Sequence, residues 1–162
     1  MSTLVVNTLA WRDVRVRLAP YAAVPLRLIV GYGFLAHGLA KWHRGPEVFA
    51  NILYAIGVPS PQLMAWLTIA TEILSGIAIL IGAFVSLISI PMIITLVVAM
   101  FTVHLPYGFS SIRLLSVRNG MAQFGPPGYE FDLLYIASIV VLALIDPTPW
   151  SIDNYRSRRT LS

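Results

Sequence analysis

A single carboxylate lies in the middle of an apolar run that is long enough to cross a bilayer. Glu72 is the only charged residue between Leu63 and Ile81. A carboxylate at that depth costs roughly 2.5–3.5 kcal/mol on insertion scales, so a basic partner, a proton or a polar cavity should accompany it. Arg27, which interrupts the first apolar segment, is a candidate partner. The sequence therefore predicts a membrane protein with a polar interior.

The composition points to a small membrane domain. The 162 residues are 57% hydrophobic and 11% charged, with a mean hydropathy of +0.78. The apolar residues fall into four segments, at about residues 21–40, 63–81, 83–103 and 131–145. About 21 residues at about 1.5 Å per residue match the roughly 30 Å hydrocarbon core, and the third segment has this length without a charge. We therefore expect an all-α, integral membrane four-helix bundle.

The bundle is expected to comprise residues 20–150, between an N-terminal segment (1–19) and a C-terminal tail (151–162). Six arginines flank it: Arg12, Arg15, Arg17, Arg156, Arg158 and Arg159. Four spans put both ends on one side of the membrane, and these charges mark that side as cytoplasmic. The N-terminal segment is expected to be cytoplasmic or interfacial. Anionic lipid explains the net charge of +4 better than nucleic acid does.

The connections between the spans are unequal. Gly82 and Ala83 leave almost no loop between the second and third spans, so these form a tight hairpin at the cytoplasmic face. Residues 41–62 and 104–129 are longer and fall on the outer side, where residues 112–117 are compatible with a short interfacial helix. The outer half of the bundle is therefore where a functional surface is expected.

The first two spans each carry a stripe of small and polar residues at helical spacing. These are Arg27, Gly31, Phe34, Gly38 and Lys41 in the first span, and Ala65, Thr68, Glu72, Ser75 and Gly76 in the second. Glycines on such stripes let two helices approach closely. Leu67, Leu74, Ile77 and Ile81 take the opposite side and should face lipid. The stripes predict a packed interface between these two spans.

Estimated depth brings Arg27 and Glu72 within reach of each other across this interface. The sequence therefore predicts an internal Arg27–Glu72 ion pair. The pair has a structural interpretation, in which it sets the helix register, and a catalytic one, in which Glu72 carries a proton or contacts a ligand. A third alternative is that Arg27 extends to the cytoplasmic surface.

A second polar group is expected near the outer ends of the spans, where His37, Lys41, His104 and Glu130 fall at similar depth. Imidazole, ammonium and carboxylate groups suit a quinone head group, whose two carbonyl oxygens need proton donors and acceptors. Asp132 lies about 200° around the helix from Glu130, so both cannot face one site. The alternative is a hydrogen-bonded network that caps the helix ends.

Other redox centres have little support in the sequence. Cysteine is absent, which excludes disulfides, thiolate metal sites and iron–sulfur clusters held by this chain. His37 and His104 as haem ligands, or joined by Glu130 around a metal, lack any closely spaced ligand pair. We therefore expect no haem, iron–sulfur cluster or metal. Redox chemistry would need a bound cofactor, a quinone-like substrate or another subunit.

Five short motifs occur in a characteristic order. They are Arg27…Gly33-Phe34…His37-Gly38…Lys41; Gly57-Val58-Pro59; Glu72 with Leu80-Ile81-Gly82; Glu130-Phe131-Asp132-Leu133-Leu134-Tyr135; and Ser151-Ile152-Asp153. In order and spacing they resemble the DoxX family of small four-helix membrane proteins of bacteria and archaea, over roughly residues 22–153. The segment from Asp146 to Trp150 departs from the glycine-containing turn typical of that family.

The resemblance implies a multi-pass protein of the prokaryotic cytoplasmic membrane with a link to quinone redox chemistry. Relatives include the membrane subunits of thiosulfate:quinone oxidoreductase. We therefore expect a subunit that binds or shapes a quinone site in the outer half of the bundle, with lipid and other redox subunits, or further copies of itself, as partners. The alternatives are a non-catalytic accessory subunit of a larger membrane complex and a small transporter with Glu72 as its ion site.

Overall fold

The computed structural model describes residues 11–110 and 112–160, and most of them are helical. Residues 11–18 form a helix that continues through a 3₁₀ turn, η1 (Ala19–Tyr21), into α2. The longer helices are α2 (Ala23–Arg44), α3 (Pro46–Ala55), α4 (Pro61–Ile81), α5 (Val85–Ala99), α6 (Glu130–Ile145) and α7 (Ile152–Thr160). A π-helical turn, η2 (Met100–His104), and a 3₁₀ turn, η3 (Leu105–Tyr107), extend α5, and strands β1 (Leu114–Arg118) and β2 (Met121–Phe124) pair as a hairpin.

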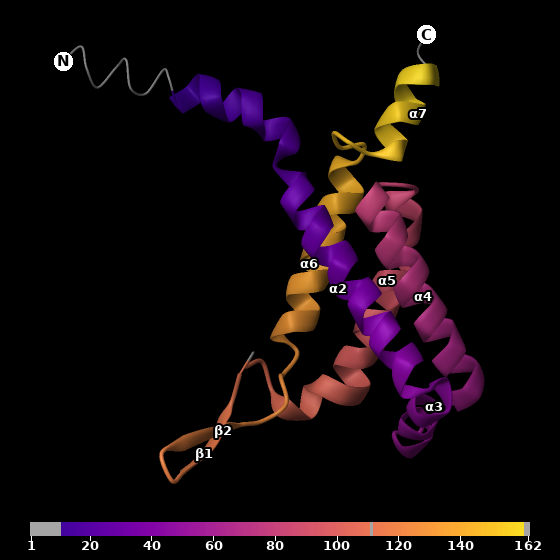
Figure 1. Ribbon diagram of the computed structural model, residues 1–162, viewed down its shortest axis with the longest axis vertical. Coiled ribbons are helices and arrows are strands. Elements are labelled where there is room, and N and C mark those ends of the chain that lie inside the picture. The colour runs from indigo at the N-terminus through magenta and orange to yellow at the C-terminus, as the bar shows by residue number, and fades with distance from the viewer. Residues whose placement is uncertain (1–10, 111, 161–162) are drawn as a thin grey trace, which may run out of the picture.

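Three helical stretches are long and apolar enough to cross a membrane: Trp11–Arg44, Pro61–Ile81 and Val85–Tyr107. Helix α6 has 16 residues, which makes it shorter than these three. It nevertheless packs against α5 and α2, while α4 packs against α2 and α5 (Figure 1). The chain is thus a mostly helical membrane protein.

The elements are divided between two ends of this helical core. Residues 11–18, the α4–α5 connection and α7 lie at one end, and α3 and the β-hairpin lie at the other (Figure 1). Only residues 82–84 separate α4 from α5, so the predicted tight hairpin is present. Gly82 closes α4 in the left-handed conformation (φ 64°), which glycine adopts without steric cost.

The predicted stripes form the contact between α2 and α4. Gly31, Phe34, Gly38 and Gly76 are buried. A Cβ atom on Gly76 would lie 2.6 Å from the backbone nitrogen of Leu35, so the two helix backbones touch here. The four residues predicted to face lipid, Leu67, Leu74, Ile77 and Ile81, are 44–66% exposed. The predicted interface between α2 and α4 is therefore confirmed, and the side predicted to face lipid is exposed.

Two segments differ from the sequence-based expectation. The predicted loop 41–62 contains a helix, α3, which begins with Pro46 in the first turn, a position that suits proline because its missing N–H needs no partner there. Residues 112–117 do not form an interfacial helix, because residues 114–117 belong to strand β1. The turn residues Asn119 (φ 52°) and Gly120 (φ 75°) both have the positive φ of a tight hairpin turn. This Asn-Gly pair was the sequence signal for the hairpin.

Candidate functional site

An ion pair joins α2 to the middle of α4. Lys41 Nζ lies 2.5 Å from Glu72 Oε1 and 2.6 Å from Glu72 Oε2. The Glu72 side chain is 8% exposed and that of Lys41 is 25% exposed, so the pair is closed on the carboxylate side and partly open on the ammonium side. The buried carboxylate therefore has the basic partner that its position requires.

The predicted Arg27–Glu72 pair is wrong, and the register of the α2–α4 contact explains why. A Cβ atom on Gly38 would lie 3.0 Å from the Cβ of Glu72, which places these two positions at one level. Lys41 follows Gly38 by one helical turn, so its side chain can reach back to the carboxylate. Arg27 precedes Gly38 by 11 residues, or about 16 Å of helix, and lies near the opposite end.

Arg27 instead binds the chain segment between α6 and α7. Its guanidinium donates hydrogen bonds to Thr148 Oγ1 (2.7 Å), to the carbonyl of Pro149 (3.3 Å) and to the carbonyl of Trp150 (2.8 Å). Arg27 is 3% exposed and Thr148 4% exposed. The arginine therefore holds the C-terminal segment against α2. The sequence analysis missed these partners, because nothing in their spacing relates them to Arg27.

The Ser151-Ile152-Asp153 motif directly follows the segment that Arg27 binds. Ser151 Oγ accepts a hydrogen bond from the Asn154 N–H and caps α7, while Asp153 Oδ2 accepts one from the Val85 N–H at the start of α5. Burial raises the pKa of Asp146, which ends α6, to about 6, and the neighbouring Asp153 carboxylate adds to the shift. These residues connect α5, α6 and α7 by capping and charge, which is a structural role.

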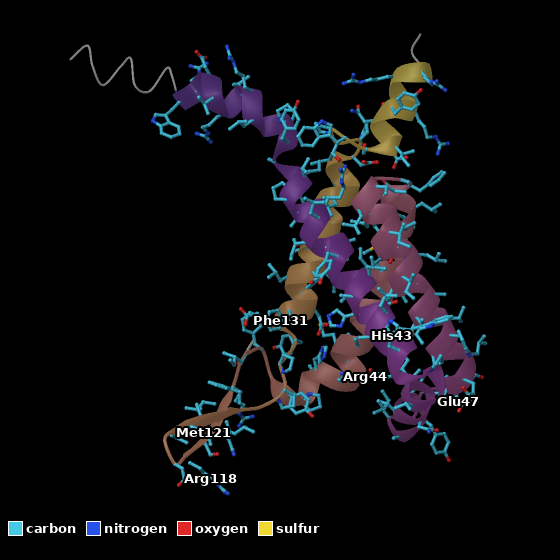
Figure 2. The ribbon with its side chains drawn as sticks, in the orientation of Figure 1. His43, Arg44, Glu47, Arg118, Met121 and Phe131 are labelled. Atoms are coloured by element: carbon cyan, nitrogen blue, oxygen red, sulfur yellow. The ribbon has the colours of Figure 1, made fainter. Side chains whose placement is uncertain are left out.

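A groove of about 410 Å³ opens beside the Lys41–Glu72 pair. It is lined by Ala36, His37, Ala40, Lys41 and Arg44, all from the C-terminal half of α2. Figure 2 shows Arg44 and His43 at the α3 end of α2, close to the end of this groove. The predicted residues His37 and Lys41 are thus brought together on one surface. The groove is shallow and open, and only α2 contributes residues to it.

His104 and Asp132 form a second pair in the same half of the molecule. His104 Nδ1 lies 2.6 Å from Asp132 Oδ2, and this contact ties η2 to the first turn of α6. The prediction that Glu130, rather than Asp132, would face His104 is therefore wrong. Asp132 is 4% exposed, because its side of α6 packs on α5, whereas Glu130, about 200° around the helix, is less deeply buried.

Tyr135 adds a phenol that the sequence analysis did not single out as a site residue. Its ring packs edge-on against Phe34, with ring centroids 6.0 Å apart. Its hydroxyl lies against Gly33, where the missing Cβ leaves room for it. The sequence contains Gly33 one turn from His37 and Tyr135 one turn from Asp132, but nothing in it places Gly33 opposite Tyr135.

The half of the molecule that contains α3 and the β-hairpin therefore combines the Lys41 ammonium, the Glu72 and Asp132 carboxylates, the His37 and His104 imidazoles and the Tyr135 phenol. Such groups can donate and accept hydrogen bonds and exchange protons. Across residues 11–110 and 112–160, no three His, Asp or Glu side chains lie close enough together to hold a metal ion. These side chains therefore bring proton donors and acceptors into one half of the molecule.

Comparison with known proteins agrees with a membrane protein of this kind. Residues 22–105 match the DoxX family model. The chain is 27% identical over 144 residues to the "Uncharacterized membrane protein Rv3486" of Mycobacterium tuberculosis, covering 86% of this chain and 84% of that protein. It is 29% identical over 130 residues to the "Putative oxidoreductase CatD" of Bacillus subtilis, covering 80% and 83%. No solved structure matches the chain.

Proposed function

The chain belongs to the DoxX family, and we propose that it is a membrane subunit that binds a quinone head group in the outer half of its helices. The groove beside the Lys41–Glu72 pair is the proposed site. A single observation carries the proposal: an ion pair in the α2–α4 contact has its ammonium side open to a groove that also contains His37.

The groups at the groove match the chemistry of a quinone. The two carbonyl oxygens of a quinone accept hydrogen bonds, which the Lys41 ammonium and the His37 imidazole can donate. Reduction to the quinol takes two electrons and two protons. Glu72 and His37 would hold and pass the protons, while the electrons would come from a redox cofactor in a partner subunit. The relative named as an oxidoreductase is consistent with this role.

The His104–Asp132 pair and Tyr135 lie in the same half of the molecule as the groove, which supports the choice of this half as the site. A histidine held by a carboxylate at 2.6 Å can exchange a proton without moving far. Glu130, at the start of α6, would contact the head group from the edge of the site. Arg27 is no longer a candidate for the reaction, because its guanidinium is engaged at the opposite end of α2.

We further propose that α6 is a fourth span and that both chain ends are cytoplasmic, in a prokaryotic inner membrane. Helices α2, α4, α5 and α6 would then form a four-helix bundle. Residues 11–18 and α7 lie at the same end of the core, and both segments carry arginines (Figure 1). This charge distribution supports a cytoplasmic location for that end.

Intrinsic fluorescence offers a direct binding test. The Trp42 and Trp66 rings lie 5.5 Å apart next to Lys41, and a bound quinone would quench them. The experiment titrates purified protein, carrying Trp11→Phe and Trp150→Phe, with short-chain ubiquinone and menaquinone analogues in lipid nanodiscs. We expect saturable quenching that Glu72→Gln and His37→Ala weaken about tenfold or more, or about 1.4 kcal/mol.

The matched control is Glu47→Gln, which removes an exposed carboxylate on α3 at the same end of the molecule. It should leave quenching unchanged. The proposal fails if neither quinone class produces saturable quenching, or if Glu72→Gln and Glu47→Gln behave alike while both variants remain folded.

A second candidate function is that of a non-catalytic accessory subunit. The mutual neutralisation of Lys41 and Glu72 favours this alternative, because setting the α2–α4 register would be a sufficient role for such a pair. Co-purification with larger redox subunits, together with no quinone binding by the isolated chain, would support this alternative over the first.

A further inference from the structure

The hairpin β1–β2 has one wholly apolar face and an opposite, more polar face, which carries Ser116 and Gln123 together with Arg118 and Met121. Ser116 pairs with Gln123, and the two side chains are hydrogen-bonded at 3.0 Å, which places them on the same face. Neighbouring residues in a strand point to opposite faces, so the adjacent pair of Val117 and Ala122 lies on the other side. A bulge between Leu114 and Ser116 brings Leu114 opposite Phe124, on the side of Ala122.

The apolar face is open along its whole length. Leu114, Val117 and Phe124 are 55%, 62% and 56% exposed, and Ala122 is also exposed. A two-stranded hairpin is only marginally stable in water by itself, and it needs its apolar face covered. The charges of the hairpin are basic, Arg118 at its tip and Arg113 just before it, and residues 108–128 contain no Asp or Glu.

The hairpin is firmly attached to the helices. On the side of the strands away from the turn, the ladder continues through three backbone hydrogen bonds. They run from Gly125 N–H to the Arg113 carbonyl, from Gly128 N–H to the Ser110 carbonyl and from Tyr129 N–H to the Gly108 carbonyl. The last of these reaches the start of α6. The hairpin therefore extends from the helix ends as an arm, with Arg118 and Met121 at its tip and Phe131 near its base (Figure 2).

The base of the arm lies among aromatic side chains. Phe109 and Tyr129 pack edge-on with ring centroids 5.6 Å apart, and Tyr107 and Phe131 are exposed beside them in the sequence. Aromatic residues of this kind concentrate at the level of lipid head groups. Along the chain, these residues lie next to η2, whose Phe101 is 59% exposed.

From this exposure and charge, we propose that the β1–β2 hairpin is a membrane-surface anchor. Given the topology proposed above, its apolar face lies in the boundary between head groups and acyl chains of the outer leaflet, and Arg113 and Arg118 bind lipid phosphates. The exposed aromatic residues between a candidate spanning helix and the arm, together with the absence of acidic residues from 108–128, favour the bilayer as the occupant over a water-soluble partner.

The absence of cysteine permits a site-specific test. Val117→Cys on the apolar face and Gln123→Cys on the polar face are labelled in turn with an environment-sensitive fluorophore. The full-length protein is reconstituted in phosphatidylcholine vesicles with and without phosphatidylglycerol. We expect the Val117→Cys label to emit at shorter wavelength and to be quenched by lipids that carry a nitroxide near the head group. The Gln123→Cys label should be quenched by aqueous iodide.

Two results would overturn the proposal. One is equal access of iodide to both labels in vesicles of either composition. The other is protection of the Val117→Cys label only in native membranes that contain the partner proteins, since this would assign the face to a protein. Because the Val117 and Gln123 side chains are both outside the helical core, helicity measured by circular dichroism should be unchanged in both variants.

Discussion

Arg27 and Thr148 lie 121 residues apart in the chain and are joined by a buried hydrogen bond of 2.7 Å. The bond connects the beginning of α2 to the turn after α6. Together with the carbonyls of Pro149 and Trp150, Thr148 replaces the carboxylate that the sequence suggested as the partner of this arginine. Backbone and hydroxyl oxygens, rather than an ion pair, thus accept hydrogen bonds from Nη1 and Nη2 of Arg27, while its buried Nε has no hydrogen-bond partner among the described residues.

Replacing Arg27 should weaken the C-terminal clamp. We expect Arg27→Ala to lower the free energy of unfolding by about 2–4 kcal/mol, because the buried Thr148 hydroxyl and two partly buried carbonyl oxygens lose a charged donor. Arg27→Lys should recover part of this loss, since a single ammonium cannot reach all three acceptors. Thermal unfolding in detergent measures both effects. Arg17→Ala, at an exposed position of the N-terminal helix, is the control, and an equal effect of Arg17→Ala and Arg27→Ala would contradict the clamp.

The Lys41–Glu72 pair should show coupling in a double-mutant cycle. Lys41→Met or Glu72→Gln alone leaves a charge between α2 and α4, and we expect each to cost about 1–3 kcal/mol, less than a fully buried pair because Lys41 is 25% exposed. The double variant should be more stable than the sum of the two losses predicts. Chemical unfolding of the four proteins gives the coupling energy, and simple additivity would show that the pair contributes nothing to stability.

The close contact between α2 and α4 predicts a sharp difference between two glycines. Gly76→Ala places a Cβ atom 2.6 Å from the backbone nitrogen of Leu35, which cannot move independently of its helix. We expect a loss of about 1–3 kcal/mol. Gly33→Ala meets the hydroxyl end of Tyr135, a side chain that can rotate away. Its loss, followed by thermal unfolding, should be smaller, and the reverse order would contradict the described packing.

Stability should fall as the pH rises through the titration of Asp146. Its pKa is raised from 3.8 to about 6, so between these values the folded protein keeps a proton that the unfolded chain has released. The corresponding stabilisation is complete below about pH 4 and is lost by about pH 6 to 7. Asp146→Asn, which has no proton to lose, should flatten this dependence and be more stable than the unmodified protein at neutral pH.

Unfolding measured from pH 4 to pH 7 tests the role of Asp146. Asp13→Asn, at an exposed position, should leave the slope unchanged. A wild-type slope that persists in Asp146→Asn would assign the titration to another group.

The sequence anticipated much of the fold but only part of the site. Periodicity alone identified the small face of α4 and its lipid-facing side, because both follow from the helical repeat. The partner of Glu72 depended on how α2 slides along α4, which estimated depth does not determine. The choice between Asp132 and Glu130 depended on the rotation of α6, which the depth estimate that favoured Glu130 does not determine. Pro46 was a local signal for the start of α3, and Asn119-Gly120 was one for the turn of the hairpin. Both segments were nevertheless predicted as parts of long loops.

By itself, the sequence determined that the chain is a helical membrane protein of the DoxX family with a charged group inside, because hydropathy and spacing are local properties of the chain. Only the tertiary structure decided that Lys41 neutralises Glu72, that Arg27 holds the segment before α7, and that His104 meets Asp132. Those pairings depend on the register and rotation of packed helices. These are set by where glycines let the backbones touch, through contacts between residues that are distant in the chain.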